Sequence, residues 1–245
     1  MNEAYCMDCM DALRNMPDNA FDLAVVDPPY GDGNTNIGGA SLWRTVRPIQ
    51  GNGAERTGGT WAAKYGKKII AWDVAPGKEY FEQLFRVSRN QIIWGGNYFD
   101  LPPTRCFLVW DKCQSDDFSM AMAEYAWTSF TGNAKMFRMP ATGKTGERFH
   151  PTQKPVKLYA WIYSRYAKSG YKILDTHLGS GSSRIAAYDA GLDFVGYEID
   201  RTYFDKQEER FRKHTKQISL LADYGVGAEA MANTQLTFDQ YLGEG

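Results

Sequence analysis

The 245-residue sequence has little that points to a membrane, to secretion or to a metal site. It contains no run of 18 or more apolar residues, no signal peptide and no lipidation motif. We therefore expect no membrane association and a cytoplasmic location. Its four cysteines are Cys6, Cys9, Cys106 and Cys113. Cys6 and Cys9 have a Cys-x-x-Cys spacing, but no second pair or nearby histidine completes a zinc site, so we expect reduced thiols and no metal.

The chain also lacks net charge, because its formal total is only −1, but the charges are unevenly distributed. Residues 31–70 carry six basic residues against two acids, and residues 135–157 carry six against one. The segment from residue 217 onward has four acids and neither lysine nor arginine. Two basic segments would suit a phosphate backbone, although charge alone does not separate that reading from an ordinary solvated surface.

Short apolar runs rich in β-branched and aromatic residues alternate with helical patterns. This alternation predicts an α/β fold, with a mostly parallel sheet and helices on both of its faces. The predicted strands are Ala4–Met7, Leu23–Val26, Gln91–Trp94, Cys106–Trp110, Tyr125–Phe130, Lys172–Leu174 and Phe194–Tyr197. The predicted helices are Met10–Asn15, Glu79–Val87, Val156–Ala167, Ser182–Ala190 and Tyr203–Lys213.

The length fits one large domain. We assign it to residues 1–216, with residues 31–70 as an insertion in a long loop rich in glycine, asparagine and threonine. A loop of this length inside a domain usually serves a function or is disordered. Residues 217–245 have little periodicity, and we interpret them as a C-terminal extension.

The run Asp175-Thr-His-Leu-Gly-Ser-Gly-Ser-Ser follows a predicted strand and opens a predicted helix. Its two glycines allow a tight turn and a close approach of the backbone to a ligand. Arg184 stands where the dinucleotide fingerprint has its third glycine, which argues against NAD or FAD. Glu198, at the end of the next strand, suits the hydroxyl groups of a ribose. A structural turn beside a surface acid is the alternative.

The run Phe21-Asp-Leu-Ala-Val-Val-Asp-Pro-Pro-Tyr30 ends an apolar strand in an acid, two prolines and an aromatic ring. The exocyclic amine of a nucleobase is a weak nucleophile, because its lone pair is delocalised into the ring. The Asp27 carboxylate and the Pro28 carbonyl would provide two acceptors for its N–H groups, held in place by the prolines. Tyr30 would stack on the base, and a base inside a duplex would have to leave the stack to reach it.

These motifs together resemble the amino-group DNA methyltransferases (adenine-N6 and cytosine-N4), in the β arrangement with the catalytic motif first and the cofactor motif last. The resemblance covers residues 4–213. It rests on the catalytic and glycine motifs and on further runs: CMDCMDAL from Cys6, MPDN from Met16, IIWGGNY from Ile92, LVWDK from Leu108, HPTQKP from His150 and GYEID from Gly196. It implies a Rossmann-like methyltransferase fold with seven strands, of which the last inserts antiparallel.

The resemblance implies S-adenosyl-L-methionine as cofactor and assigns roles to individual residues. Asp8 would contact its adenine, Glu198 its ribose, and Asp175, Gly179 and Gly181 its methionine end. The full implied cofactor set is Asp8, Asp27, His150, Lys154, Pro155, Asp175, His177, Gly179, Ser180, Gly181, Ser182 and Glu198, and the catalytic set is Asp27, Pro28, Pro29 and Tyr30. His177 stands where the family usually has phenylalanine, and we expect it to pack rather than to act in catalysis.

The partner that the resemblance implies is double-stranded DNA, and the family also admits a homodimer and a cognate restriction endonuclease. We expect the two basic segments to contact the DNA. The residues selected for this role are Trp43, Arg44, Arg47, Trp61, Lys64, Lys144 and Arg148. The loop tryptophans would enter the duplex or, alternatively, only pin the loop to the domain.

The predicted activity is site-specific methylation of adenine N6 in a flipped-out base. In the family, cytosine-N4 enzymes usually have serine at the position of Asp27, and enzymes acting on RNA or protein amides usually have asparagine. No cysteine follows a proline, so the nucleophile of the carbon-5 cytosine enzymes is absent. The alternatives are cytosine-N4 methylation, a catalytically silent fold that binds DNA, and a dinucleotide oxidoreductase.

Overall fold

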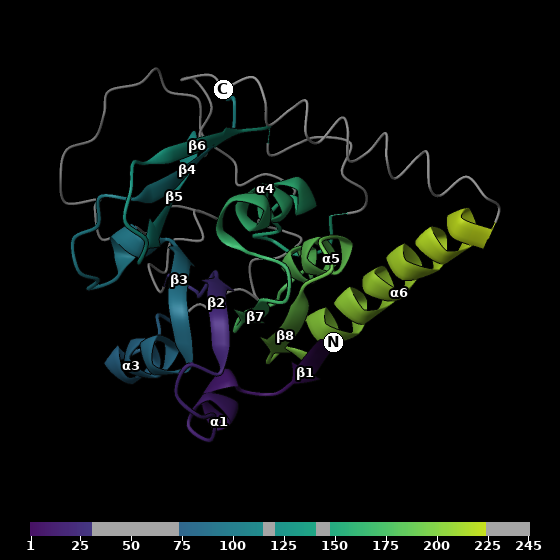
Figure 1. The fold of residues 1–245 in the computed structure, drawn as a ribbon, viewed down its shortest axis with the longest axis horizontal. Helices are drawn as coiled ribbons and strands as arrows, with labels where there is room; N and C mark the ends of the chain where they lie inside the picture. Colours follow the sequence, from purple (N-terminus) through teal and green to yellow (C-terminus); the bar gives the residue numbers. More distant parts are fainter. Residues whose placement is uncertain (31–73, 115–120, 141–147, 224–245) are drawn as a thin grey trace, which may run out of the picture.

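The fold is built on one eight-stranded sheet, seen near the middle of Figure 1. The structure is a computed structural model, and it describes residues 1–30, 74–114, 121–140 and 148–223. The strands are β1 (Asn2–Cys6), β2 (Phe21–Val26), β3 (Ser88–Trp94), β4 (Phe107–Asp111), β5 (Ala123–Thr128), β6 (Lys135–Arg138), β7 (Lys172–Asp175) and β8 (Asp193–Glu198). Their order across the sheet is β1-β8-β7-β2-β3-β5-β4-β6.

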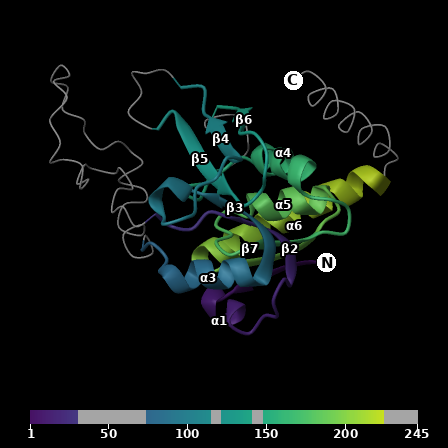
Figure 2. The same ribbon diagram turned by 60° about the vertical axis from the view of Figure 1, so that its left-hand side comes forward.

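Helices cover both faces of this sheet, as the alternation of strands and helices predicts. They are α1 (Cys9–Leu13), α3 (Lys78–Val87), α4 (Val156–Tyr166), α5 (Ser182–Asp189) and α6 (Arg201–Asp223), with a short 3-10 helix η2 (Gly96–Tyr98). Along β2, Leu23 and Val25 pack in one buried cluster with α4 and α5, while Ala24 and Val26 pack in the other with α1 and α3. Figure 2 shows α1 and α3 together, apart from α4 and α5.

The predicted α/β fold class, with a mostly parallel sheet and helices on both faces, is confirmed, but the sheet has eight strands where the sequence predicted seven. The additional strand is β6, which pairs with β4 at the edge of the sheet. Only Phe137 of its four residues is partly buried, so the segment has no apolar run from which a strand could be predicted. The antiparallel strand is β5, between β3 and β4, and it is fifth along the chain rather than last.

The largest difference between a predicted and an observed element boundary is at the end of the last helix. Helix α6 runs to Asp223 instead of Lys213, so the predicted start of the C-terminal extension at residue 217 falls inside a helix. Its last two turns contain Ile218, Leu220 and Leu221, apolar residues that the predicted boundary left outside the helix. The predicted insertion at 31–70 and the residues after 223 lie outside the described ranges.

The topology brings three acids to one edge of the sheet. The chain passes from β2 through α3 to β3 in one direction, and from β7 through α5 to β8 in the other, so the strand order reverses between β2 and β7. Ligands of open parallel sheets bind at such a reversal, beyond the carboxyl ends of the strands. Asp27 follows β2, Asp175 ends β7 and Glu198 ends β8 at this edge.

The central strands should dominate the stability of the fold. Ile173 on β7 is fully buried between β2 and β8. We predict that Ile173→Ala lowers the free energy of unfolding by about 2–5 kcal/mol, because it leaves a cavity in the core. Val74→Ala, at a position with 70% exposure, is the control and should change it by less than about 0.5 kcal/mol. Chemical denaturation of both variants measures this, and equal small losses would contradict the packing described here.

Candidate active site

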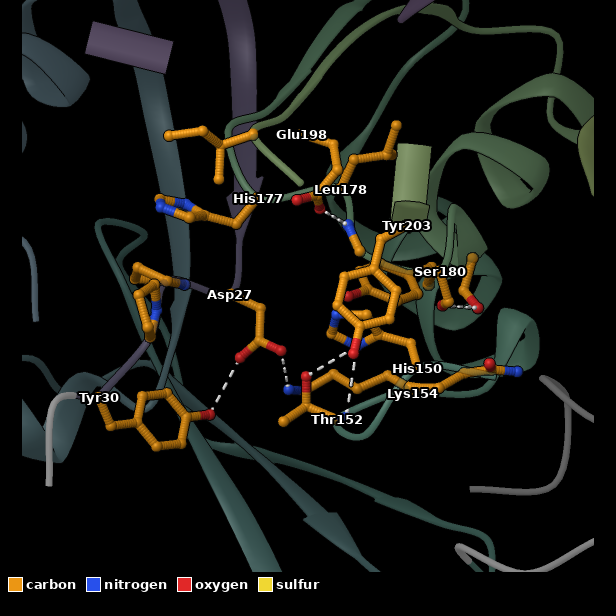
Figure 3. A pocket seen from close by; sticks show the side chains of 17 residues that line it. Asp27, Tyr30, His150, Thr152, Lys154, His177, Leu178, Ser180, Glu198 and Tyr203 are labelled. Atoms are coloured by element: carbon orange, nitrogen blue, oxygen red, sulfur yellow. Dashed lines mark hydrogen bonds and ion pairs between the residues drawn. The ribbon is translucent and has the colours of Figure 1, made fainter. Parts of the chain in front are cut away.

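A cavity of about 230 Å³ opens at the strand reversal. Figure 3 shows Asp27 between Tyr30 and Lys154, with Glu198 farther along the same cavity. The walls come from the ends of β2, β7 and β8, from the segment before α4 and from the start of α6. The lining residues are Asp27, Pro28, Pro29, Tyr30, His150, Thr152, Gln153, Lys154, Tyr159, His177, Leu178, Gly179, Ser180, Ser182, Glu198, Ile199 and Tyr203.

The Asp-Pro-Pro-Tyr run forms one end of the cavity. The Tyr30 hydroxyl donates a hydrogen bond of 3.0 Å to Asp27 Oδ1. The Tyr30 ring stacks on Tyr98, with ring centroids 4.6 Å apart and planes 10° apart. Gly95 has a φ of +67°, and a Cβ placed there would come within 2.1 Å of the Tyr30 ring. Any larger residue at position 95 would overlap the Tyr30 ring, so glycine is required there for Tyr30 to lie beside Asp27.

The other oxygen of Asp27 is paired with a lysine. The Lys154 ammonium binds Asp27 Oδ2 and lies 3.1 Å from Glu124 Oε2. The Lys154 side chain is only 3% exposed. Although burial lowers the pKa of Lys154, the Asp27 and Glu124 carboxylates outweigh it and raise that pKa above its usual value. Burial raises the pKa of Asp27, and the Lys154 ammonium opposes that rise. Lys154 therefore keeps its proton at neutral pH.

The glycine turn after β7 forms the opposite end. The backbone N–H of Gly179 donates to Glu198 Oε2 at 2.8 Å, and that of Asp200 donates to Glu198 Oε1 at 2.9 Å. Gly179 has a φ of +53°, and a Cβ there would approach the His150 ring to 3.3 Å. His150 packs edge-on against Tyr203, with centroids 4.4 Å apart. Burial lowers the pKa of His150 to about 3, so the ring is neutral.

His177 is held by a chain of hydroxyl groups. The Tyr80 hydroxyl lies 2.6 Å from Thr176 Oγ1, which lies 2.9 Å from His177 Nδ1. The His177 ring also packs edge-on against the Tyr80 ring, with centroids 5.4 Å apart. Burial lowers the pKa of His177 to about 4. A neutral ring thus occupies the position at which the resemblance leads one to expect phenylalanine.

The structure brings most of the predicted cofactor set together around this cavity, but not all of it. Asp8 caps α1 by accepting a 2.8 Å hydrogen bond from the Met10 N–H. Gly181 faces Gln207 of α6, and Pro155 is the residue before α4. Asp175 is 2% exposed and accepts hydrogen bonds from the Ser183 hydroxyl and the His177 N–H. These four residues do not line the cavity, and contact between them and a cofactor stays a prediction.

Sequence reasoning did not select several of the lining residues. They are Thr152, Gln153, Tyr159, Leu178, Ile199 and Tyr203. Thr152 and Gln153 belong to the HPTQKP run, so that motif was a signal for them. The sequence-based prediction also missed Glu124 on β5, whose carboxylate lies 3.1 Å from the Lys154 ammonium. Neither its single charge nor its place in a strand pattern distinguishes it in the sequence.

Most of the predicted DNA-contacting residues, namely Trp43, Arg44, Arg47, Trp61, Lys64 and Lys144, lie outside the described residues. Arg148 is described, and its guanidinium donates to the Pro151 carbonyl at 2.7 Å. In the described ranges, no group of three or more His, Cys, Asp or Glu side chains could hold a metal ion. All four cysteines are free thiols. None of the helices within those ranges has the length and apolar character needed to span a bilayer.

Comparison with known proteins points to one family. A family model described as DNA methylase, for N6 and N4 methyltransferases, matches residues 108–209. These matches support the amino-group DNA methyltransferase family for this chain. The chain is 22% identical over 254 residues to the type II methyltransferase M2.MboI of Moraxella bovis, covering 86% of this chain and 88% of that protein. It is 22% identical over 258 residues to the type II methyltransferase M.HinfI of Haemophilus influenzae, covering 84% of this chain and 67% of that protein.

Solved structures share the fold of this methyltransferase. The PvuII DNA methyltransferase, described as cytosine-N4-specific, has a TM-score of 0.54 at 12% identity, covering 88% of this chain and 91% of that one. A DNA modification methylase of Thermus thermophilus, solved in complex with S-adenosyl-L-methionine, has a TM-score of 0.50 at 15% identity, covering 87% and 96%. At these identities the similarity establishes the fold and leaves the target base open.

Asp175 generates a prediction about pH. Burial raises its pKa from the usual 3.8 to about 7, so the folded state favours the protonated carboxyl. The contribution of the protonated Asp175 carboxyl to the free energy of unfolding is fully present below the pKa of Asp175 in the unfolded chain, near 4. It is lost as the pH rises through about 7, its pKa in the folded protein. We predict that Asp175→Asn flattens the decline in unfolding free energy between these two pH values. Denaturation at each pH measures it, with Asp11→Asn on the exposed face of α1 as control. An unchanged decline in Asp175→Asn would contradict the assignment.

Proposed function

We propose that this methyltransferase transfers a methyl group from S-adenosyl-L-methionine to the N6 amine of a flipped-out adenine at specific sites in double-stranded DNA. The observation that carries the proposal is the position of the Asp27 carboxylate. It lies in the same cavity as the glycine turn and Glu198, with Tyr30 on one oxygen and Lys154 on the other. An acceptor for an amine and a binding place for a methyl donor thus share one enclosed space.

The residues of the cavity suit this cofactor. Asp27 and Glu198 line it, Asp175 is buried at the end of β7, and burial raises the pKa of all three carboxyls. Buried carboxylates of this kind favour a cationic ligand, which relieves their desolvation. Gly179 leaves the wall beside Glu198 free of a side chain, and the oxygens of Glu198 keep lone pairs for ribose hydroxyls. When bound, the cofactor supplies a methyl group made electrophilic by its sulfonium.

The task of the protein residues is to bind the amine, orient it and receive its proton. The Asp27 carboxylate accepts a hydrogen bond from one N–H of the amine and takes the proton that the nitrogen loses on methylation. Burial raises the pKa of Asp27, which favours that proton transfer. The Tyr30 ring, already stacked on Tyr98 and backed by Gly95, provides a flat surface for the base.

The choice of adenine rests on aspartate as the first residue of the catalytic run. A cytosine-N4 activity is the second candidate, because the chain shares its fold with the PvuII methyltransferase, which is described as cytosine-N4-specific. DNA contacts by the basic segments, a homodimer and a cognate endonuclease stay predictions. The family model, which is described as DNA methylase, supports DNA as the substrate.

The target base can be identified directly. We predict that DNA incubated with the protein and methyl-labelled S-adenosyl-L-methionine, then digested to nucleosides, carries the label in N6-methyladenine. Label in N4-methylcytosine would show that the target base is cytosine and that the adenine assignment is wrong. The absence of label from every nucleoside, with genomic DNA of mixed sequence as substrate, would refute the proposed activity.

Asp27 should be required for transfer but not for cofactor binding. We predict that Asp27→Ala lowers the rate of label transfer by at least about 10²-fold, because the acceptor for the amine is lost. Binding of S-adenosylhomocysteine, measured by calorimetry, should change little. The matched control is Asp22→Ala at the other end of β2, where the carboxylate accepts a bond from the Lys172 N–H. Transfer by Asp27→Ala at the rate of Asp22→Ala would show that the role given to Asp27 is wrong.

A further inference from the structure

The Lys154–Asp27 pair is the end of a longer row of alternating charges. Behind Lys154 lies Glu124, whose Oε1 is 2.7 Å from the Lys112 ammonium and whose Oε2 is 3.1 Å from the Lys154 ammonium. The row Lys112–Glu124–Lys154–Asp27 thus contains two cations and two anions. It leads from the end of β4, across β5, to the catalytic end of β2. Glu124 and Lys112 do not line the cavity, and the proposed chemistry does not use them.

Strand pairing builds this row. Trp110 of β4 is opposite Glu124 of β5, and the N–H of Lys112 donates to the Met122 carbonyl at 2.9 Å, so Lys112 continues the antiparallel pairing beside Glu124. The Lys112 ammonium lies 5.3 Å from the Trp110 ring centroid. The Lys154 ammonium lies 5.3 Å from the centroid of Trp94, which is fully buried on β3. Each cation therefore has an indole on one side and a carboxylate on another, which restricts its position.

The two central members of the row, Glu124 and Lys154, are charged at neutral pH. The two ammonium groups lower the pKa of Glu124 to about 2, despite the burial that raises it. The Asp27 and Glu124 carboxylates raise the pKa of Lys154. Removing one member of such a buried row leaves an unbalanced charge, whereas the intact row is neutral as a whole. A simple ion pair between Lys154 and Asp27 would have been neutral without Glu124 and Lys112, so neutrality does not explain these two residues.

The geometry of the row explains the presence of Glu124 and Lys112. An ammonium group that contacts one carboxylate can swing around it, but contacts with two carboxylates and an indole fix its position. With Lys154 fixed on Oδ2, Asp27 cannot rotate freely about its terminal bond. Within the described ranges, Oδ1 then accepts a bond only from Tyr30 and keeps a lone pair for a further donor.

We propose that Glu124, supported by Lys112, is a positioning residue for methyl transfer: it holds Lys154 on Oδ2 of Asp27 and so presents Oδ1 to the amine of the target base. This inference rests on the proposed function, because it assigns the amine to Asp27. A misplacement of the reacting groups by about 1 Å can cost on the order of 10²-fold in rate, so a residue outside the cavity can control the reaction.

The proposal predicts a distinctive pH profile. Replacing Glu124 by glutamine removes one of the two carboxylates that raise the pKa of Lys154, so Lys154 should lose its proton at a lower pH. The other titratable groups near this row are His150, neutral because its pKa is about 3, and Tyr30 and Tyr159, whose pKa values burial raises well above the usual value. None of these three changes its charge between neutral and moderately alkaline pH.

The experiment compares variants of the full-length protein in single-turnover transfer of labelled methyl groups to DNA, from about pH 6 to about pH 10. We expect Glu124→Gln to lower the rate by about 10-fold to 100-fold at neutral pH and to lose further activity at alkaline pH, where the wild type does not. Affinity for S-adenosylhomocysteine, measured by calorimetry, should stay within about twofold, since Glu124 lies outside the cavity. The control is Glu79→Gln on α3, which removes a carboxylate from an exposed ion pair with Arg14 at the end of α1 and should leave both the rate and the affinity unchanged.

Lys112→Met is the second variant. This change removes the Lys112 ammonium that pairs with Glu124, so the position of Glu124 is less restricted and the rate of methyl transfer should fall. Because the Glu124 carboxylate still raises the pKa of Lys154, the loss of activity at alkaline pH should not appear. A Glu124→Gln protein with the rate and pH profile of Glu79→Gln would overturn the proposal. So would a rate that falls equally at every pH, or the loss of S-adenosylhomocysteine binding by both variants, because either result indicates a structural role. If the wild type transfers methyl groups to cytosine, the proposed target base fails while the role of Glu124 is still tested on that product.

Discussion

The contact between the Lys154 ammonium and the Asp27 carboxylate is the interaction on which the rest of the site depends. A buried carboxylate alone would take up a proton and would no longer accept a hydrogen bond from an amine. Lys154 opposes that tendency, and it comes from a segment 127 residues farther along the chain. The loop before α4 must therefore pack over the end of β2 before the catalytic run has the charge that its chemistry needs.

The rest of the cavity is arranged around buried charge. Three carboxyls with raised pKa values lie at the reversal of strand order, where a cationic ligand would relieve the cost of their burial. The neutral rings of His150 and His177 line the same cavity. Two glycines give the space that this arrangement requires: Gly95 under the Tyr30 ring and Gly179 against His150.

Sequence patterns predicted much of the fold and part of the site. All seven predicted strands and all five predicted helices are present, because each has a continuous apolar run or a clear amphipathic pattern. Strand β6 was not predicted, since it is an exposed edge strand that contributes one partly buried ring. Within the site, Asp27, Tyr30, Gly179 and Glu198 were predicted because short motifs at strand ends contain them. Glu124 was not, because a single acid in a strand pattern carries no local signal.

The sequence by itself determined the fold class, the resemblance to a family and the edge of the sheet at which the catalytic and glycine motifs meet, since these depend on local patterns and on chain order. Only the tertiary structure decided the partners of each charge. Lys154 belongs to a motif expected beside the cofactor, yet its ammonium lies between Asp27 and Glu124. Asp8, expected at the cofactor, caps a helix. Ion pairs between distant segments depend on the register of the strands and the packing of loops, and these are fixed only when the whole sheet has formed.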